Sequence, residues 1–249
     1  MRKTKIVATV GPACKDPRIL KKLILEGVDV FRINASHTDP AGIAKWFKIL
    51  RAISWALQKH TSILVDLQGP RVRTGRVKNS TMRLEEGKIL YIKIGNGPGG
   101  GNTITTSCRP FSRMVKKGDK VLIDNGAIEL KVESVAQARV VCRVIVGGIL
   151  GENKGINLPN APVTLPALTS KDLEDLKAAA KLGADYVALS FVRSVEDVDV
   201  IKRWMRVRGL DIPVIAKIEK PQAVKGIDSI LKKAVGREGA FNLAGACLF

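Results

Sequence analysis

The stretch Val214–Glu219 reads Val-Ile-Ala-Lys-Ile-Glu, a short apolar run that ends in one cation and one anion. Side chains alternate along a strand, so Lys217 and Glu219 share one face with Ile215, while the other three residues form an apolar face. Burying a charge without a partner is costly. The stretch therefore predicts a buried strand whose end builds a site.

Strands and helices are expected to alternate in two parts of the sequence, which are separated by a central segment without helical patterns. We expect strands at 6–10, 28–34, 62–67, 186–191 and 213–219, and helices at 19–25, 43–57, 170–181 and 195–208. Such alternation is typical of a parallel α/β sheet. Ser170 is the expected N-cap of the third helix, and Gly183 follows its end.

The helical patterns disappear between residues 71 and 160. Short strands are expected at 89–94, 120–123, 128–135 and 139–145, and the glycine-rich run 95–101 is interpreted as a hairpin tip because it lacks the Gly-Lys-Ser/Thr ending of a phosphate-binding loop. We predict an all-β insertion, a small barrel or sandwich, over 71–160. The α/β domain is then split into 1–70 and 161–249.

A complete (β/α)8 barrel has eight strands, and only five of that type are found here. The predicted fold class is therefore α/β: an incomplete TIM-type barrel with an inserted all-β lid domain.

Charge is the unusual feature of the composition. The 249 residues include 42 Lys and Arg against 23 Asp and Glu, a net charge of +19, which favours anionic ligands such as nucleotides and phosphometabolites. Aromatic residues make up 4% and do not interleave with basic ones, which argues against nucleic acid as the main partner. Four scattered cysteines fit free thiols in a reducing cytosol, and no run reaches membrane-span length. We expect a cytoplasmic protein without membrane contact.

Polar side chains also follow the second and third strands. Arg32, Asn34 and Ser36 would share a face at the C-terminal end of the second strand, where barrel enzymes carry their chemistry. A solvated strand end is the alternative interpretation there. Asp66 ends the third strand shortly before two arginines, which suggests an ion or phosphate site, although a lone Asp at such a position is commonly a cap.

In this order the segments resemble pyruvate kinase over about residues 4–230. Arg32–His37 reads Arg-Ile-Asn-Ala-Ser-His, similar to the family's Arg-Leu-Asn-Phe-Ser-His. The other matching runs are Thr4–Pro12, Gly69–Gly75, Asp124–Gly126, Lys154–Pro159, Leu165–Ala167, Lys171–Asp172, Ser190–Arg193 and Ala216–Glu219. The resemblance implies a (β/α)8 barrel with a β-barrel lid inserted after its third strand.

The resemblance also implies phosphoryl transfer from phosphoenolpyruvate to ADP, giving pyruvate and ATP in glycolysis. Lys217 and Arg32 would be catalytic, and Arg32, His37, Arg73 and Lys154 would bind the nucleotide and the transferring phosphoryl group. This chemistry depends mainly on positioning and on neutralising charge, so a site rich in cations fits it. The family is homo-oligomeric.

Metal ligands follow from the same matches. Glu219 would bind Mg²⁺ or Mn²⁺, and a monovalent cation would be held by Asn34, Ser36, Asp66 and the backbone carbonyl of Leu67. Mg²⁺ is usually bound by few carboxylates together with substrate oxygens and water, which agrees with a single acidic residue at the end of a strand.

Two departures from the family pattern change the expectations. Arg71 stands where many members have Glu, and members that do not need potassium carry Lys there, so the guanidinium would replace K⁺. Residues 232–241 read Lys-Lys-Ala-Val-Gly-Arg-Glu-Gly-Ala-Phe where the family has a strand with Ala-Arg-Gly-Asp and a second metal carboxylate. We expect a chain truncated after its fifth barrel strand. A catalytically inactive remnant that binds nucleotide or other polyanions is therefore the alternative function.

Overall fold

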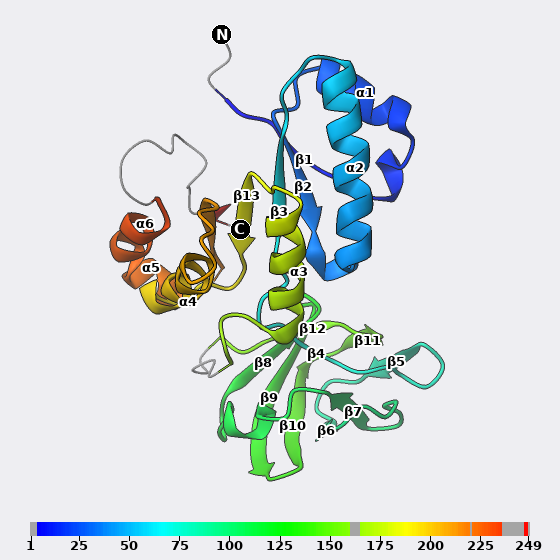
Figure 1. The fold of residues 1–249 in the computed structure, drawn as a ribbon. Coiled ribbons are helices and arrows are strands. Elements are labelled where there is room, and N and C mark those ends of the chain that lie inside the picture. Colours follow the sequence, from blue (N-terminus) through cyan, green and yellow to red (C-terminus); the bar gives the residue numbers. More distant parts are fainter. Residues whose placement is uncertain (1–3, 160–164, 220, 236–246, 249) are drawn as a thin grey trace. The chain divides into compact units, whose positions relative to one another are not determined.

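The structure, a computed structural model, describes residues 4–159, 165–219, 221–235 and 247–248 (Figure 1). The chain divides into two compact units. We call Met1–Pro70 with Pro166–Phe249 the barrel unit, and Arg71–Leu165 the β unit. Residues 236–246 and 249 lie outside the described residues, but Cys247–Leu248 pair in parallel with Lys217–Ile218, so the expectation of only five barrel strands was one strand short.

The barrel unit contains a parallel sheet in the order β1-β2-β3-β13-β14-β15. Its strands are β1 (Val7–Thr9), β2 (Val30–Asn34), β3 (Ser62–Asp66), β13 (Tyr186–Leu189), β14 (Val214–Ile218) and β15 (Cys247–Leu248). Its helices are α1 (Pro17–Leu25), α2 (Pro40–Ala56), α3 (Ser170–Lys181), α4 (Val195–Arg206), α5 (Pro221–Lys225) and α6 (Ile227–Val235), with short helices η1 (Pro12–Cys14) and η2 (Ala35–His37). The predicted strand and helix alternation of an α/β fold is confirmed.

The start of α3 differs from the sequence-based expectation. Thr169, not Ser170, is the N-cap, because its hydroxyl accepts a hydrogen bond from the backbone N–H of Asp172. The Asp172 carboxylate accepts in return from the Thr169 N–H, which completes a capping box. The prediction of the cap was therefore wrong by one residue.

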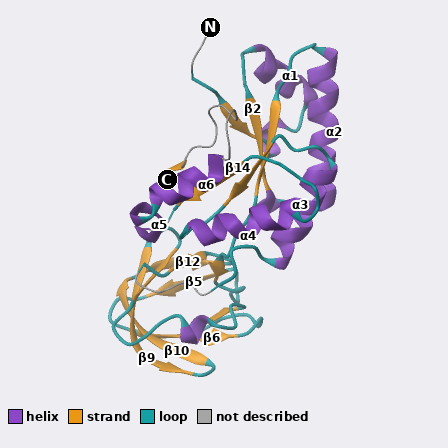
Figure 2. Cartoon of the chain, turned by 60° about the vertical axis from the view of Figure 1, so that its left-hand side comes forward, coloured by secondary structure: helices purple, strands orange, loops and turns teal. Residues whose placement is uncertain are grey.

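Apolar side chains pack on both faces of the sheet. Val214, Ala216 and Ile218 belong to the large core with residues of the surrounding helices, which flank the sheet in Figure 2. A small inner cluster consists of Val30, Leu64, Ala188 and Ile215. The two faces predicted for β14 are thus confirmed. Side chains two positions apart on a strand share a face. The residues that lie two positions after the members of this inner cluster are Arg32, Asp66, Ser190 and Lys217.

The β unit contains no α-helix among its described residues. Its strands are β4 (Val72–Arg73), β5 (Thr81–Leu84), β6 (Ile89–Ile94), β7 (Thr103–Thr106), β8 (Lys120–Ile123), β9 (Ile128–Ala136), β10 (Arg139–Val146), β11 (Gly148–Gly151) and β12 (Gly155–Asn157), with the short helix η3 (Phe111–Arg113). They form a sheet in the order β4-β12-β8-β9-β10-β6-β7 and a β11-β5 pair. The expected all-β character is confirmed.

The glycine-rich run 95–101 forms a hairpin tip only at its end, where Gly100 and Thr103 exchange two backbone hydrogen bonds across a tight antiparallel turn. It connects β6 to β7, and these strands pair in parallel, with Tyr91 opposite Thr103 and Ile94 opposite Thr106. The run must therefore carry the chain back to the starting end of β6 rather than simply reverse it. The local glycine signal could not distinguish these two connections.

None of the described helices combines the length and the apolar character that crossing a membrane requires.

Candidate active site

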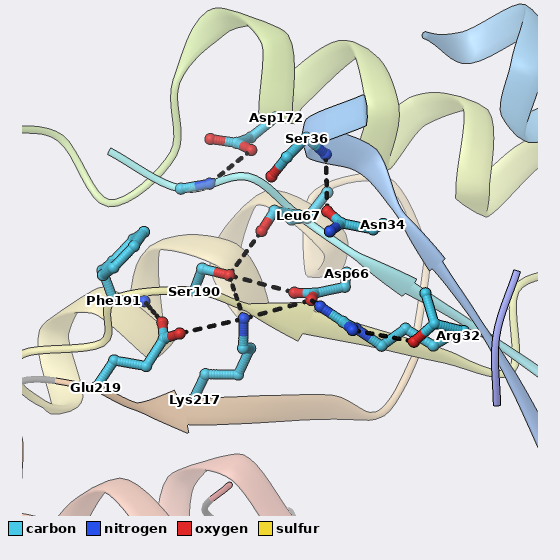
Figure 3. A network of polar contacts seen from close by, with 12 residues as sticks. Arg32, Asn34, Ser36, Asp66, Leu67, Asp172, Ser190, Phe191, Lys217 and Glu219 are labelled. Carbon is cyan, nitrogen blue, oxygen red and sulfur yellow. Dashed lines mark hydrogen bonds and ion pairs between the residues drawn. The ribbon is translucent and has the colours of Figure 1, made fainter. Parts of the chain in front are cut away.

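A buried polar network lies at the C-terminal ends of β2, β3 and β14 (Figure 3). Arg32 donates to Asp66 Oδ2 from Nε at 2.8 Å and from Nη2 at 2.6 Å. Lys217 Nζ approaches the same oxygen at 3.3 Å. The side chains of Asp66 and Lys217 are only 3% and 11% exposed. The network thus pairs one buried carboxylate with two cations.

Ser190 joins this network from the end of β13. Its Oγ donates to the Leu67 carbonyl at 2.8 Å and accepts from Lys217 Nζ at 3.0 Å, and it also lies 3.2 Å from Asp66 Oδ1. Ser190 lies in the run Ser190–Arg193 that resembles the family, but the resemblance predicts no role for it. The signal that could have found it is its place two residues after the buried Ala188, on the inner face of the sheet.

Glu219 follows the end of β14 and completes the network on the other side of Lys217. Its Oε1 lies 3.4 Å from Lys217 Nζ, and its Oε2 accepts the backbone N–H of Phe191 at 2.9 Å. Phe191 has a φ of +57°, which is uncommon for a bulky residue and occurs mostly where the surroundings impose it. The Glu219 carboxylate thus binds the amide of a residue in the left-handed region and the ammonium of the central lysine.

The expectation that Ser36 shares a strand face with Arg32 and Asn34 was wrong. Strand β2 ends at Asn34, and Ser36 lies in the η2 turn, where its backbone N–H donates to Asn34 Oδ1 at 3.0 Å. An asparagine side chain that binds the backbone two residues on forms such a turn readily. His37 ends the same turn and is exposed.

The remaining sequence-predicted residues belong to the β unit. Arg73 pairs with Gly155 between β4 and β12, and its Nη1 donates to the Asn153 carbonyl at 2.9 Å. Burial, together with the neighbouring Arg71, lowers the pKa of Arg73. Lys154 Nζ pairs with Asp124 at 2.9 Å. The antiparallel pairing of β4 and β12 therefore brings Arg73 and Lys154 to one region of this unit.

Gly69 is the glycine whose conformation the site requires. It has a φ of +68°, and a Cβ added there would lie 2.9 Å from the Ser190 carbonyl oxygen. We expect Gly69→Ala to lower the free energy of unfolding by about 2–4 kcal/mol, because a left-handed backbone conformation and a steric clash add up. Denaturant titration measures this loss.

Gly183→Ala is the matched control for that substitution. Gly183 has a similar φ of +73°, but no atom lies within 4 Å of its added Cβ. Only the conformational cost of about 1–2 kcal/mol should remain there. Equal losses for the two variants would contradict a close approach of Gly69 to Ser190.

Comparisons with known proteins agree with this geometry. A family model described as pyruvate kinase, barrel domain, matches residues 1–237. The pyruvate kinase of Corynebacterium efficiens is 39% identical over 230 residues, which are 92% of this chain and 48% of that protein. The pyruvate kinase of Mycobacterium tuberculosis is 40% identical, with 92% and 49% covered.

A solved structure gives the same result. The crystal structure of a pyruvate kinase from Cryptosporidium parvum superposes with a TM-score of 0.86 at 32% identity, and the match covers 94% of this chain and 50% of that one. The chain spans about half the length of the curated relatives it matches. The chain belongs to the pyruvate kinase family.

Proposed function

We propose that this chain carries the phosphoryl-transfer site of a pyruvate kinase-type phosphotransferase, which converts phosphoenolpyruvate and ADP to pyruvate and ATP. The observation that carries the proposal is the position of Lys217. Its ammonium is held within 3.4 Å of two carboxylates and one hydroxyl, at the end of a parallel sheet where barrel enzymes carry their chemistry.

Lys217 would act as the main electrostatic group. Phosphoryl transfer spreads negative charge over oxygens, and fixed cations aimed at those oxygens lower the barrier without reorganising during the reaction. Asp66, Ser190 and Glu219 restrict the ammonium on the protein side. Arg32, whose side chain is 28% exposed, would contribute a second cation.

Glu219 would supply a protein ligand to Mg²⁺ or Mn²⁺. Mg²⁺ prefers oxygen ligands and usually takes only one or two carboxylates, with substrate phosphates and water filling the rest. The Glu219 carboxylate is a donor of the right chemistry and lies next to the ammonium that would face the substrate. The bound metal would neutralise charge on the phosphoryl oxygens.

The other family-derived roles are part of the same proposal. Arg32, His37, Arg73 and Lys154 would contact nucleotide and phosphoryl oxygens. A monovalent cation would use oxygens of Asn34, Ser36, Asp66 and Leu67, of which the Leu67 carbonyl already accepts from Ser190 and keeps a second lone pair. We expect the protein to work in the cytoplasm.

A coupled assay of pyruvate formation tests the proposed function. The full chain is supplied with phosphoenolpyruvate, ADP and Mg²⁺, and Lys217→Met gives the background rate. Pyruvate formed well above that background supports the phosphotransferase. No pyruvate from a folded chain that still binds ADP in calorimetry would overturn it in favour of the inactive, nucleotide-binding alternative.

Potassium should have little effect on the activity. Arg71 stands where many family members have Glu, and a tethered guanidinium would supply the positive charge that K⁺ otherwise brings. Replacing KCl with choline chloride at constant ionic strength should change kcat/KM by less than about twofold. The matched variant Arg71→Glu should become dependent on K⁺. A large K⁺ activation of the wild-type chain would contradict this prediction.

A further inference from the structure

Lys171, the second residue of α3, contacts the segment that follows β2. Its Nζ donates to the backbone carbonyls of Ala35 at 2.8 Å and Thr38 at 2.9 Å, and to Asp175 Oδ2 at 2.6 Å. A lysine ammonium has three N–H donors and no acceptor. All three donors thus have a partner, and two of these partners are backbone carbonyls of one short turn.

The two carbonyls lie on either side of the candidate ligands in η2. Ser36 and His37 stand between Ala35 and Thr38, and the turn directly follows Asn34, the last residue of β2. A single side chain therefore holds both ends of the segment that presents Ser36 and His37. The other described tie of this turn is local, from the Ser36 N–H to Asn34 Oδ1.

Asp172, the next residue of α3, binds the segment that follows β3. Its Oδ1 accepts the backbone N–H of Gly69 at 3.0 Å, while Oδ2 accepts from the N–H and the hydroxyl of Thr169. Asp172 is fully buried. Adjacent residues of one helix therefore anchor the chain after two neighbouring strands that carry candidate site residues.

Asp175 aims the ammonium of Lys171. Its side chain is fully buried, and among the described residues its Oδ1 has no hydrogen-bond partner, so Lys171 is its main compensation. Burial raises the pKa of Asp175 against the opposing effect of Lys171. Only the Asp175 partner of this ion pair is fully buried. A pair that desolvates a carboxylate contributes little to stability compared with apolar packing, and a specific geometry is the better reason to keep one.

We propose that Lys171 is a positioning residue of the candidate active site. Oriented by Asp175, and together with Asp172, it fixes segments 35–38 and 67–69 so that Ser36, His37 and the Leu67 carbonyl keep their places. The effect of Lys171 on catalysis rests on the proposed function, whereas its effect on the order of the η2 turn is independent of that function.

Hydrogen exchange of the full chain, followed by mass spectrometry on peptides, tests the proposal. The test variant is Lys171→Met with Asp175→Asn, which removes the ties to the turn without leaving a buried charge unpaired. The control is Lys177→Met with Glu174→Gln, two exposed residues of the same helix. Exchange in peptides covering 34–39 should become at least about tenfold faster in the test variant, with α4 and β13 unchanged.

Activity gives the second readout. In the test variant kcat should fall at least about tenfold, while the midpoint of denaturant unfolding stays within the range of the control. Unchanged exchange over 34–39, or an equal increase throughout the barrel unit, would overturn the positioning role. If the wild-type chain forms no pyruvate, the proposed function fails, and the exchange measurement still decides the role of Lys171.

Discussion

Lys217→Met should lower the rate of pyruvate formation by about a thousandfold or more. Fixed cations and hydrogen-bond donors aimed at developing charge contribute factors of about 10²–10⁵ when they are removed one at a time. Lys217 is the buried ammonium between Asp66 and Glu219, and methionine keeps its length and apolar stem while deleting the charge. Steady-state kinetics with varied phosphoenolpyruvate measures the loss, which should fall mainly on kcat.

Two variants control this prediction. Lys202→Met removes a half-buried lysine on α4, outside the network, and should leave the kinetics unchanged. Lys217→Arg keeps the charge, but its planar fork does not fit the space of a compact ammonium, so little activity should return. A Lys217→Met protein with kcat within tenfold of the wild type would contradict the central role given to this lysine.

The inner face of the sheet could be predicted from the sequence because it depends on a local period. Alternation along β14 separates Lys217 from Val214 and Ala216, and the same rule places Asp66 at the end of β3. These positions require only that each strand be recognised. The apolar face of each strand must pack against the helices, which leaves the other face for the polar site residues.

The contacts that organise the site could not be predicted in this way. Ser190 receives its role from the pairing of β13 with β3 and β14, which brings its hydroxyl to Leu67 and Lys217. Lys171 meets Ala35 across 136 positions of sequence. Such contacts depend on the packing of distant segments, on which a local pattern carries no information.

The local geometry of turns was the other source of error. Ser36 was expected on the strand face of Arg32 and Asn34, whereas the Asn34 side chain accepts the Ser36 N–H in a turn that follows the strand. The parallel pairing of β6 and β7 was missed for a similar reason, since a run of glycines permits many connections. Both errors concern where the chain turns. The expected strands of the barrel unit and β6, β8, β9 and β10 were found, whereas the shorter strands β5, β7, β11 and β12 were not among those expected.

Asp66→Asn should lower the free energy of unfolding by about 2–4 kcal/mol, the range for removing one partner from a buried, hydrogen-bonded ion pair. The variant keeps the size of the side chain but removes the negative charge that Arg32 and Lys217 both face. It also replaces one acceptor oxygen with an N–H donor group, which must then face either the two cations or the hydroxyl of Ser190.

Asp185→Asn is the matched control for this loss. The Asp185 Oδ2 accepts from the Ile63 N–H and from Arg51, so an asparagine can keep that oxygen in place. Arg51 is partly solvated and keeps its hydrogen bonds to the backbone carbonyls of Thr61 and Gly183. Its loss should stay near 1 kcal/mol. Guanidinium titration of both variants compares them directly, without any need for activity. An Asp66→Asn chain as stable as Asp185→Asn would mean that Arg32 and Lys217 do not depend on this carboxylate, and the network would then not be the charge-balanced centre on which the proposed chemistry relies.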